Sequence, residues 1–195
     1  AKWVMAEKLK DPQPFVVELG SNDGIMLRHF VAAGVRSLGV EPSANVAAAA
    51  RKIGVDTVSE FFSAEFARRL KAERGPADAL LGANVMCHIP AIRGIAEGAA
   101  ELLKPEGLLI FEDPYLGDVI EKTSYDQIYD EHVFLFSVRS VAAAFAPFGL
   151  SVVDVLPQST HGGSMRYVLG RPAYHQPSPR VAAQIAHEAA LGLER

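Results

Sequence analysis

Residues 16–24 read Val-Val-Glu-Leu-Gly-Ser-Asn-Asp-Gly, and this stretch decides the fold. A short apolar run ends around the acid Glu18 and is followed by Gly20 and Gly24, after which the pattern becomes helical. Continuous apolar runs of this kind are typical of parallel strands that are buried on both faces. In an open parallel sheet, ligands lie beyond the carboxyl ends of the strands, and glycine lets the backbone approach them closely. The stretch therefore predicts a strand, a ligand-binding turn and a helix.

The residues of this turn indicate the charge of its ligand. The turn departs from the dinucleotide-binding pattern Gly-x-Gly-x-x-Gly, because Asn22 replaces the middle glycine and Asp23 follows it. The carboxylates of Glu18 and Asp23 repel a diphosphate and attract a cofactor that carries an ammonium and a sulfonium group. The turn thus predicts S-adenosylmethionine rather than NAD as the cofactor. The predicted contacts in the turn are Glu18, Gly20, Ser21, Asn22 and Gly24.

A second acid, Glu41, ends the next predicted strand and precedes Pro42, and both are predicted to contact the cofactor. A carboxylate at this place can accept hydrogen bonds from the ribose hydroxyls of an adenosine. That contact serves any adenosine cofactor, so it does not separate a methyltransferase from an NAD enzyme. Either acid alone is as readily explained as a solvated strand end, whereas the two together, in this order and spacing, favour a cofactor site.

Short apolar runs alternate with longer segments of helical period, which indicates a parallel sheet with helices on both faces. Strands are predicted at residues 15–19, 37–40, 55–58, 79–83, 108–111, 150–155 and 165–169. Helices are predicted at residues 24–33, 43–53, 64–74, 91–103 and 137–146. Only a loop, residues 156–163, joins the last two strands, so they should pair as an antiparallel hairpin. The predicted fold is a doubly wound α/β fold, with a seven-stranded, mostly parallel sheet of the Rossmann-like methyltransferase layout and an antiparallel C-terminal hairpin.

Three regions are predicted along the chain. Residues 1–14 form an N-terminal linker helix, residues 15–171 form the cofactor-binding domain, and residues 172–195 form a proline-rich linker and an amphipathic helix. The predicted sheet has no strand left for this last helix to cover. We therefore expect the helix to lead into a further C-terminal domain rather than to pack back on the cofactor-binding domain.

The composition of the chain limits the classes of partner and the cellular location that we expect. The 195 residues, 49% of them hydrophobic and 22% charged, are typical of one soluble globular domain. A formal net charge of -4 without a basic run argues against a nucleic-acid partner and favours a small-molecule substrate. The single cysteine, Cys87, excludes an internal disulfide and a metal site built from cysteines; no metal is predicted, and a cytoplasmic location is expected. No apolar run approaches the roughly 20 residues that cross a bilayer, so no membrane association is expected.

Five motifs make the chain resemble the class I S-adenosylmethionine-dependent methyltransferases. Its later half resembles, more specifically, the nucleotide-sugar C-methyltransferases of deoxysugar and antibiotic biosynthesis. The motifs are Glu-Leu-Gly-Ser-Asn-Asp-Gly at 18–24, Gly-Val-Glu-Pro at 39–42, Asn-Val-Met-Cys-His-Ile at 84–89, Tyr-Asp-Glu-His at 129–132 with Phe-Ser at 136–137, and His-Gly-Gly-Ser-Met-Arg at 161–166. The first two are general to the superfamily, and the last three carry the likeness to the sugar enzymes.

The resemblance implies roles for residues of the middle motifs. Asn84 would lie beside the cofactor and His88 would face the substrate. The resemblance assigns to His132 the role of the base that removes a proton from the carbon beside a ketone, which suits a side chain that titrates near neutral pH. Tyr129 would support it by donating a hydrogen bond to the developing enolate oxygen, and Glu131 would orient or tune the base.

Two further sets of predicted ligand contacts are explained equally well by packing or by a turn. Phe62 follows the third predicted strand, where it would hold an adenine ring, although ordinary core packing explains it as well. His161, Gly163 and Arg166 are predicted to bind the substrate, because glycines at a strand start suggest a backbone that passes close to a bulky group. A hairpin turn, with Arg166 paired to an acid, accounts for the same residues.

Together these features predict an enzyme that transfers a methyl group from S-adenosylmethionine to a carbon beside the keto group of a nucleotide-linked deoxysugar. A small-molecule O- or N-methyltransferase on the same fold is the first alternative. A cofactor-binding fragment without turnover is the second, because full-length members of the family resembled carry an N-terminal zinc-binding domain and a further C-terminal domain. An NAD-dependent reductase is a weaker alternative, opposed by Asn22 and Asp23.

Overall fold

The computed structural model describes residues 1–194, with the exception of the His161 side chain. Seven strands form one mixed sheet in the order β3-β2-β1-β4-β5-β7-β6, which confirms the predicted fold class. The strands are β1 (Phe15–Leu19), β2 (Arg36–Val40), β3 (Thr57–Val58), β4 (Ala77–Ala83), β5 (Leu103–Pro114), β6 (Ser151–Gln158) and β7 (Ser164–Gly170). The helices are α1 (Lys2–Glu7), α2 (Leu27–Ala32), α3 (Ala44–Lys52), α4 (Ala64–Arg74), α5 (Ile92–Leu102), α6 (Leu116–Glu121), α7 (Val138–Phe145) and α8 (Pro179–Ala190).

The chain divides into two compact units. The first consists of Ala1–Gly82 and Glu97–Leu109, and the second of Ala83–Ala96 and the chain from Ile110 onward. No helix in the described part of the chain has both the length and the apolar character of a membrane span.

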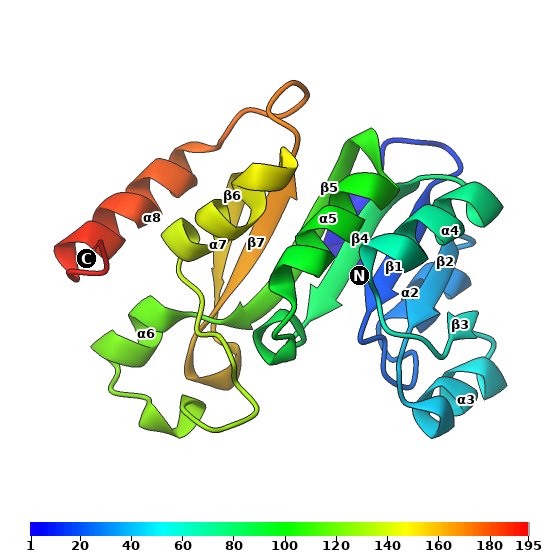
Figure 1. Ribbon diagram of the computed structural model, residues 1–195, viewed down its shortest axis with the longest axis horizontal. Helices are drawn as coiled ribbons and strands as arrows, with labels where there is room; N and C mark the ends of the chain where they lie inside the picture. The colour runs from blue at the N-terminus through cyan, green and yellow to red at the C-terminus, as the bar shows by residue number, and fades with distance from the viewer. Residues whose placement is uncertain (195) are drawn as a thin grey trace. The chain divides into compact units, whose positions relative to one another are not determined.

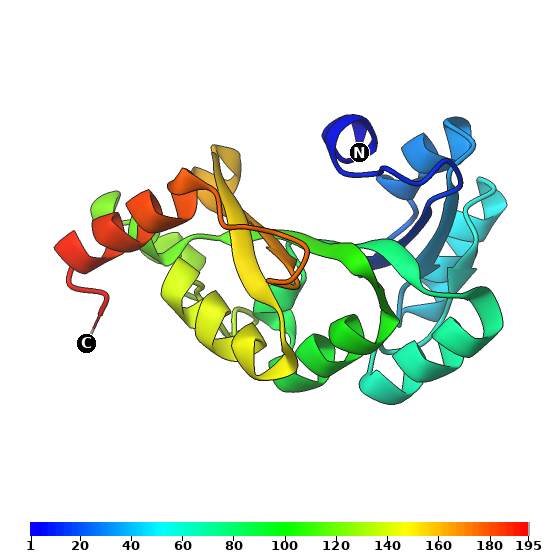
Figure 2. The same cartoon turned by 90° about the horizontal axis from the view of Figure 1, so that it is seen from above.

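β1 is the central strand of the first unit (Figure 1). It pairs in parallel with β2 and with β4, so that Leu19 lies opposite Val40 on one side and Gly82 on the other. Its residues are all buried, Glu18 included, as expected for a strand covered on both faces. Figure 2 shows this covering, with α1 and α2 on one face of the strands and α4 on the opposite face. Because the strands are parallel, the carboxyl ends of β1 and β2 meet at one edge, which carries the predicted cofactor turn.

β5 is longer than the sequence predicted. The prediction began at residue 108 because Pro105 and Gly107 are typical turn residues. The strand instead begins at Leu103. Lys104 holds its first part in place, because its Nζ pairs with the carboxylates of Asp11 and Asp78, each at 2.8 Å. A tertiary ion pair therefore overrides the local turn signal.

Three other elements also differ from the prediction. β3 has only two residues, Thr57–Val58, rather than residues 55–58. α2 begins at Leu27 rather than at residue 24, because Gly24 has a left-handed φ of +84° that no helix accommodates. The sequence did not predict α6, whose six residues are too few for a helical period to stand out.

The second unit confirms the predicted hairpin. β6 and β7 pair antiparallel from Ser151 opposite Gly170 to Gln158 opposite Ser164, with an irregularity near Asp154. Its core contains a group of aromatic rings, in stacked and edge-on contacts, from β5, β7, α7 and the segment before α7. The rings in contact are Phe111, Phe136, Phe145 and Tyr167, with 4.9 Å between the centroids of Phe111 and Tyr167.

α8 packs back on α7 and β6 of the second unit, contrary to the expectation that it only leads onward. Its Glu188 is fully buried and accepts hydrogen bonds from the backbone N–H of Val138 at 2.6 Å and of Arg139 at 3.2 Å, and from the Tyr115 hydroxyl at 3.1 Å. The first two donors are the free amides at the start of α7, which are unpaired in any helix. Glu188 thus ties α8 to the N-terminus of α7.

Glu188→Ala should lower the free energy of unfolding by about 2–4 kcal/mol, because it leaves two backbone amides and a buried hydroxyl without an acceptor. Urea unfolding followed by circular dichroism measures this loss. His187→Ala is the matched control, since it removes only a half-exposed pair with Glu121 and should change stability by less than about 0.5 kcal/mol. Equal effects of the two substitutions would contradict this role for Glu188.

Candidate active site

The predicted cofactor turn follows a buried acid, Glu18, that lies near the end of β1. Glu18 is only 3% exposed, and its Oε2 has no hydrogen-bond partner among the described residues. Burial raises the pKa of Glu18 to about 8. The carboxyl group is therefore mostly neutral at pH 7 and costs free energy to ionise unless a cation reaches it.

The backbone after Glu18 adopts the strained geometry of a binding turn. Gly20 and Asn22 both have left-handed φ values, +58° and +52°, and such a value is uncommon for a residue other than glycine. Ser21 between them is fully buried, and its Oγ has no partner in the described chain. It lies so close to β2 that a Cβ on Gly39 would be 2.3 Å from Oγ. The sequence predicted the turn and its glycines, but not this second unpaired polar atom.

Glu41 lies beside the same turn, at the end of β2. Its Oε2 accepts a hydrogen bond from the Asn22 backbone N–H at 3.1 Å, and its Oε1 accepts one from Ser43 N–H at 2.9 Å. These two bonds fix the carboxylate, and each oxygen keeps further acceptor capacity for a ligand hydroxyl. The structure thus brings Glu41 and Asn22 together, and Pro42 follows with its carbonyl accepting a hydrogen bond from Ser59 Oγ.

The two adjacent phenylalanines after β3 differ in environment. Phe62 packs on α5, where a Cβ on Gly98 would lie 2.6 Å from its ring, and its edge contacts Phe66. Phe61 is 80% exposed. Core packing therefore accounts for part of the Phe62 ring, and Phe61 has the free aromatic surface.

Asn84 is the first of the predicted site residues in the second unit. Its φ of +51° is left-handed, and its backbone N–H donates to the Glu112 carbonyl at 2.7 Å. This bond places the 3-10 turn Met86–His88 beside the end of β5. The sequence placed Asn84 and His88 just after a strand, which the structure shows.

His88 and His132 form a pair with ring centroids 4.9 Å apart. Nδ1 of His132 lies 2.8 Å from the Gln127 carbonyl, and its Nε2 lies 2.9 Å from the Tyr129 hydroxyl. Nδ1 of His88 lies 2.8 Å from the Glu131 carbonyl. Because a carbonyl only accepts, both Nδ1 atoms carry the hydrogen, and in the neutral rings each Nε2 is left as the acceptor.

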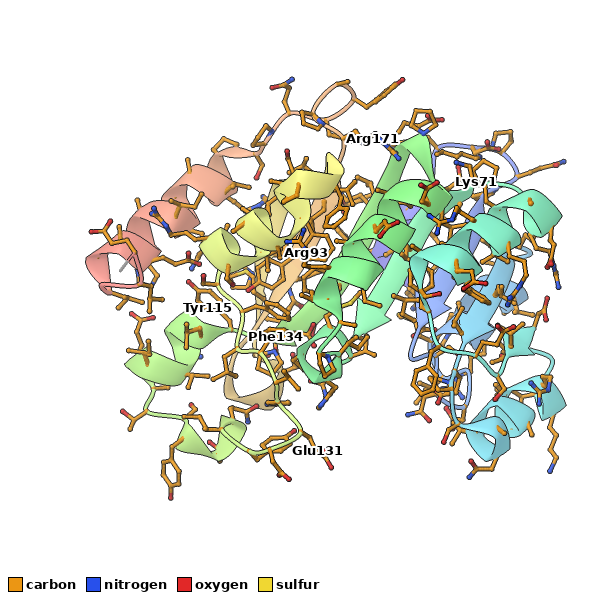
Figure 3. The ribbon with its side chains drawn as sticks, in the orientation of Figure 1. Lys71, Arg93, Tyr115, Glu131, Phe134 and Arg171 are labelled. Carbon is orange, nitrogen blue, oxygen red and sulfur yellow. The ribbon has the colours of Figure 1, made fainter. Side chains whose placement is uncertain are left out.

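Tyr129 and Glu131 lie beside this pair, on the segment that precedes α7. The rings of Tyr129 and His132 have centroids 4.1 Å apart. Desolvation raises the pKa of Tyr129, and the charges of Cys87 and Glu131 raise it further, so the phenol stays protonated and donates. The Glu131 side chain is exposed and points away from the ribbon in Figure 3, and its backbone carbonyl accepts from His88 Nδ1. His88 and Glu131, with Asp130 and Val133, line an open pocket of about 460 Å³.

Two residues of this cluster were missed by sequence reasoning, Cys87 and Asp113. Cys87 is fully buried, and its Sγ and one nitrogen each of His88 and His132 lie within 4.8 Å of one another, a spacing compatible with a metal ion. A thiol must lose its proton to bind a metal. Burial, then the Asp113 carboxylate, raise the pKa of Cys87, which opposes that loss. The thiol of Cys87 is therefore protonated in the metal-free chain.

The last motif, residues 161–166, lies at the turn between β6 and β7, and its Arg166 pairs with Glu112. Its Nε and Nη2 donate to Glu112 Oε2 at 3.2 and 2.8 Å. Gly163 has a φ of +144°, and a Cβ there would lie 2.2 Å from Asp118, so its glycine is explained by packing. The predicted contact His161 lies outside the described side chains. The structural explanation of this motif thus accounts for Gly163 and Arg166.

Comparisons with known proteins identify the family of the chain. A family model described as a methyltransferase domain matches residues 4–155. The chain is 38% identical over 180 residues to the C-methyltransferase NovU of Streptomyces niveus, a match that covers 91% of this chain and 43% of NovU. The chain therefore spans less than half the length of that relative.

Solved structures share the fold at low identity. The magnesium protoporphyrin IX methyltransferase ChlM of Synechocystis PCC 6803, solved with bound SAH, has a TM-score of 0.67 and 17% identity, with 87% of this chain and 79% of that chain covered. The cyclopropane synthase MmaA2 of Mycobacterium tuberculosis has a TM-score of 0.67 and 13% identity, with 87% and 83% covered. The chain belongs to the family of methyltransferase domains, and its predicted place among the class I S-adenosylmethionine-dependent methyltransferases is confirmed in family and fold.

Proposed function

We propose that this domain binds S-adenosylmethionine and methylates a carbon beside the keto group of a nucleotide-linked deoxysugar. The proposal rests on the imidazole of His132. Its Nδ1 is bonded to the Gln127 carbonyl, which leaves Nε2 as the acceptor for the Tyr129 hydroxyl. The 38% identity to a protein named as a C-methyltransferase supports carbon as the methylated atom.

The residues at the ends of β1 and β2 fit the cofactor. Glu18 offers a buried carboxyl with an unpaired oxygen to a cationic ligand, and Ser21 offers an unpaired hydroxyl. Glu41, held by two backbone amides, is placed to accept from ribose hydroxyls. When bound, S-adenosylmethionine supplies an electrophilic methyl group.

Tyr129 and His132 would make the nucleophile. Without substrate, the Tyr129 hydroxyl donates to His132 Nε2, and a substrate ketone competes for the same O–H. Once Tyr129 donates to the ketone oxygen, Nε2 is free to take a proton from the adjacent carbon, and the C–H electron pair moves toward the ketone. The O–H of Tyr129 then stabilises the enolate oxygen, and the Gln127 carbonyl keeps the protonated ring oriented.

Two alternatives make different demands on this cluster. A small-molecule O- or N-methyltransferase needs no proton removal from carbon, so it has no use for His132 as a carbon base. A cofactor-binding fragment without turnover needs only the predicted cofactor contacts and no base. Measurements of proton exchange at the substrate carbon and of cofactor binding therefore distinguish the proposed function from its two alternatives.

Glu41→Ala should weaken S-adenosylmethionine binding about 10- to 100-fold, because the ribose hydroxyls lose their charged acceptor. Isothermal titration calorimetry measures the change in Kd. Glu73→Ala, an exposed acid on α4, is the matched control and should leave Kd unchanged. An unaltered Kd in Glu41→Ala would rule out the proposed ribose contact.

Glu18 should make the stability of the ligand-free protein depend on pH. Its folded pKa of about 8 exceeds the ordinary value of 4.5, so the unfolded chain releases this proton at lower pH than the folded chain. The stabilisation is fully present below about pH 4.5 and is lost as pH rises to about 8. Glu18→Gln should reduce the difference in unfolding free energy between pH 5 and pH 8 by on the order of 3 kcal/mol. Urea unfolding curves that change with pH identically in both proteins would contradict the raised pKa.

His132→Gln should slow the exchange of solvent deuterium into the carbon beside the ketone at least ~100-fold, because the base is removed. Tyr129→Phe should slow it about tenfold, because the enolate oxygen loses a donor. Mass spectrometry of a nucleotide-linked keto-deoxysugar after incubation measures both rates, with His29→Gln, exposed on α2, as the control. Exchange at the normal rate in His132→Gln would exclude His132 as the base, and methyl transfer without exchange in the natural chain would indicate a heteroatom methyltransferase.

A further inference from the structure

Three groups that can bind a metal lie close together in the second unit. Sγ of Cys87 and one ring nitrogen each of His88 and His132 all lie within 4.8 Å of one another. In a tetrahedral zinc site, neighbouring ligand atoms are roughly 3.3–3.7 Å apart, so side-chain movements on the order of 1 Å bring the three atoms onto one ion. No metal was predicted from the sequence, because a single cysteine cannot build a cysteine cluster; here two histidines supply the other ligands.

Backbone carbonyls hold both imidazoles in the tautomer that suits a metal. Nδ1 of His88 lies 2.8 Å from the Glu131 carbonyl. Nδ1 of His132 lies 2.8 Å from the Gln127 carbonyl. Because the carbonyls only accept, each Nδ1 carries the hydrogen, and Nε2 keeps the lone pair in the neutral ring. Histidines that bind metals almost always donate their other N–H in this way, which orients the ring and raises its basicity.

An open pocket gives solvent access to this cluster. His88 lines the pocket of about 460 Å³ together with Asp130, Glu131 and Val133. The side chains of Asp130 and Glu131 are exposed, and their negative charges raise the local concentration of cations. A metal ion can therefore reach His88 from solvent.

The donor set favours zinc over the harder divalent cations. One thiolate and two imidazoles suit Zn²⁺, whereas Mg²⁺ and Ca²⁺ prefer oxygen ligands. Three protein ligands leave the fourth tetrahedral position to water. Cys87 binds as the thiolate, so the bond from Sγ to the metal forms as the S–H bond breaks and the proton passes to the buffer. Burial raises the pKa of Cys87, so the removal of this proton reduces the affinity.

We propose that Cys87, His88 and His132 form a Zn²⁺ site whose occupation inhibits the enzyme. Metal binding and proton removal need the same lone pair on His132 Nε2, the atom that now accepts from the Tyr129 hydroxyl at 2.9 Å. Zinc on this atom takes the lone pair and displaces the Tyr129 bond. The inhibition rests on the proposed function, in which His132 is the base, whereas the metal site itself rests on the cluster alone.

Absorption spectra during titration with Co²⁺ test the metal site without substrate. One equivalent of Co²⁺ should bind the natural chain and produce a thiolate-to-cobalt charge-transfer band, and Zn²⁺ but not Mg²⁺ should displace it. Cys87→Ser and His88→Gln should each weaken Co²⁺ binding by more than the ~10- to 100-fold that loss of an outer-sphere partner costs. His29→Gln, exposed on α2, is the matched control and should leave the affinity unchanged.

His88 is only partly buried, so His88→Gln keeps the test decisive if Cys87→Ser folds poorly. Tyr129→Phe should bind Co²⁺ at least as tightly as the natural chain, because its hydroxyl competes with the metal for His132 Nε2. Absence of the charge-transfer band in the natural chain, or an unchanged affinity in His88→Gln, would overturn the proposed site.

Deuterium exchange into the keto sugar tests the inhibition. One equivalent of Zn²⁺ should slow exchange in the natural chain at least ~10-fold, because the base is occupied, and a chelator should restore the rate. The same Zn²⁺ concentration should change the rate of Cys87→Ser far less. Zinc that binds the cluster but leaves exchange unchanged would overturn the inhibition. Absence of exchange in the metal-free natural chain would sink the proposed function alone, because the Co²⁺ spectra decide the metal site separately.

Discussion

A carboxyl group near the end of a buried strand is costly to ionise, and each unit contains one such group. Glu18 near the end of β1 and Asp113 near the end of β5 are both almost fully buried, and both have carboxyl oxygens without partners in the described chain. Hydrophobic residues would pack there more stably. Under the proposed function, the cost of burying Glu18 is accounted for by the positive charge of the cofactor that binds beside it.

The backbone around these acids shows the same bias toward function over stability. Asn22 and Asn84, which follow β1 and β4, adopt left-handed φ values that are unfavourable for most residues. Such conformations persist only when neighbouring contacts hold them, as the Glu41 carboxylate does for the Asn22 amide and the Glu112 carbonyl does for Asn84. The strain lies where strands give way to loops, which is where an open α/β sheet binds ligands.

Much of this arrangement was predictable from local pattern. The buried run ending at Glu18, the glycine turn and the acid at Glu41 follow from strand periodicity and charge, and the hairpin follows from loop length. The full extent of β5 was not predictable, because the pairing of Lys104 with Asp11 and Asp78 joins residues distant in sequence. The docking of α8 through Glu188 escaped prediction for the same reason. The burial of Asp113 was within reach, since it lies at the end of an apolar run as Glu18 does, but an acid is recognised as buried only when its surroundings are known.

The most direct test of the account is the proton balance of cofactor binding. At pH 7 the free protein holds a proton on Glu18, and a cationic ligand beside it should expel that proton. Calorimetric titrations with S-adenosylmethionine in buffers of different ionisation enthalpy measure the number of protons released. A large fraction of one proton should be released at pH 7, and this release should disappear in Glu18→Gln. Binding with no proton release, or tight binding of NADH with none of S-adenosylmethionine, would contradict it.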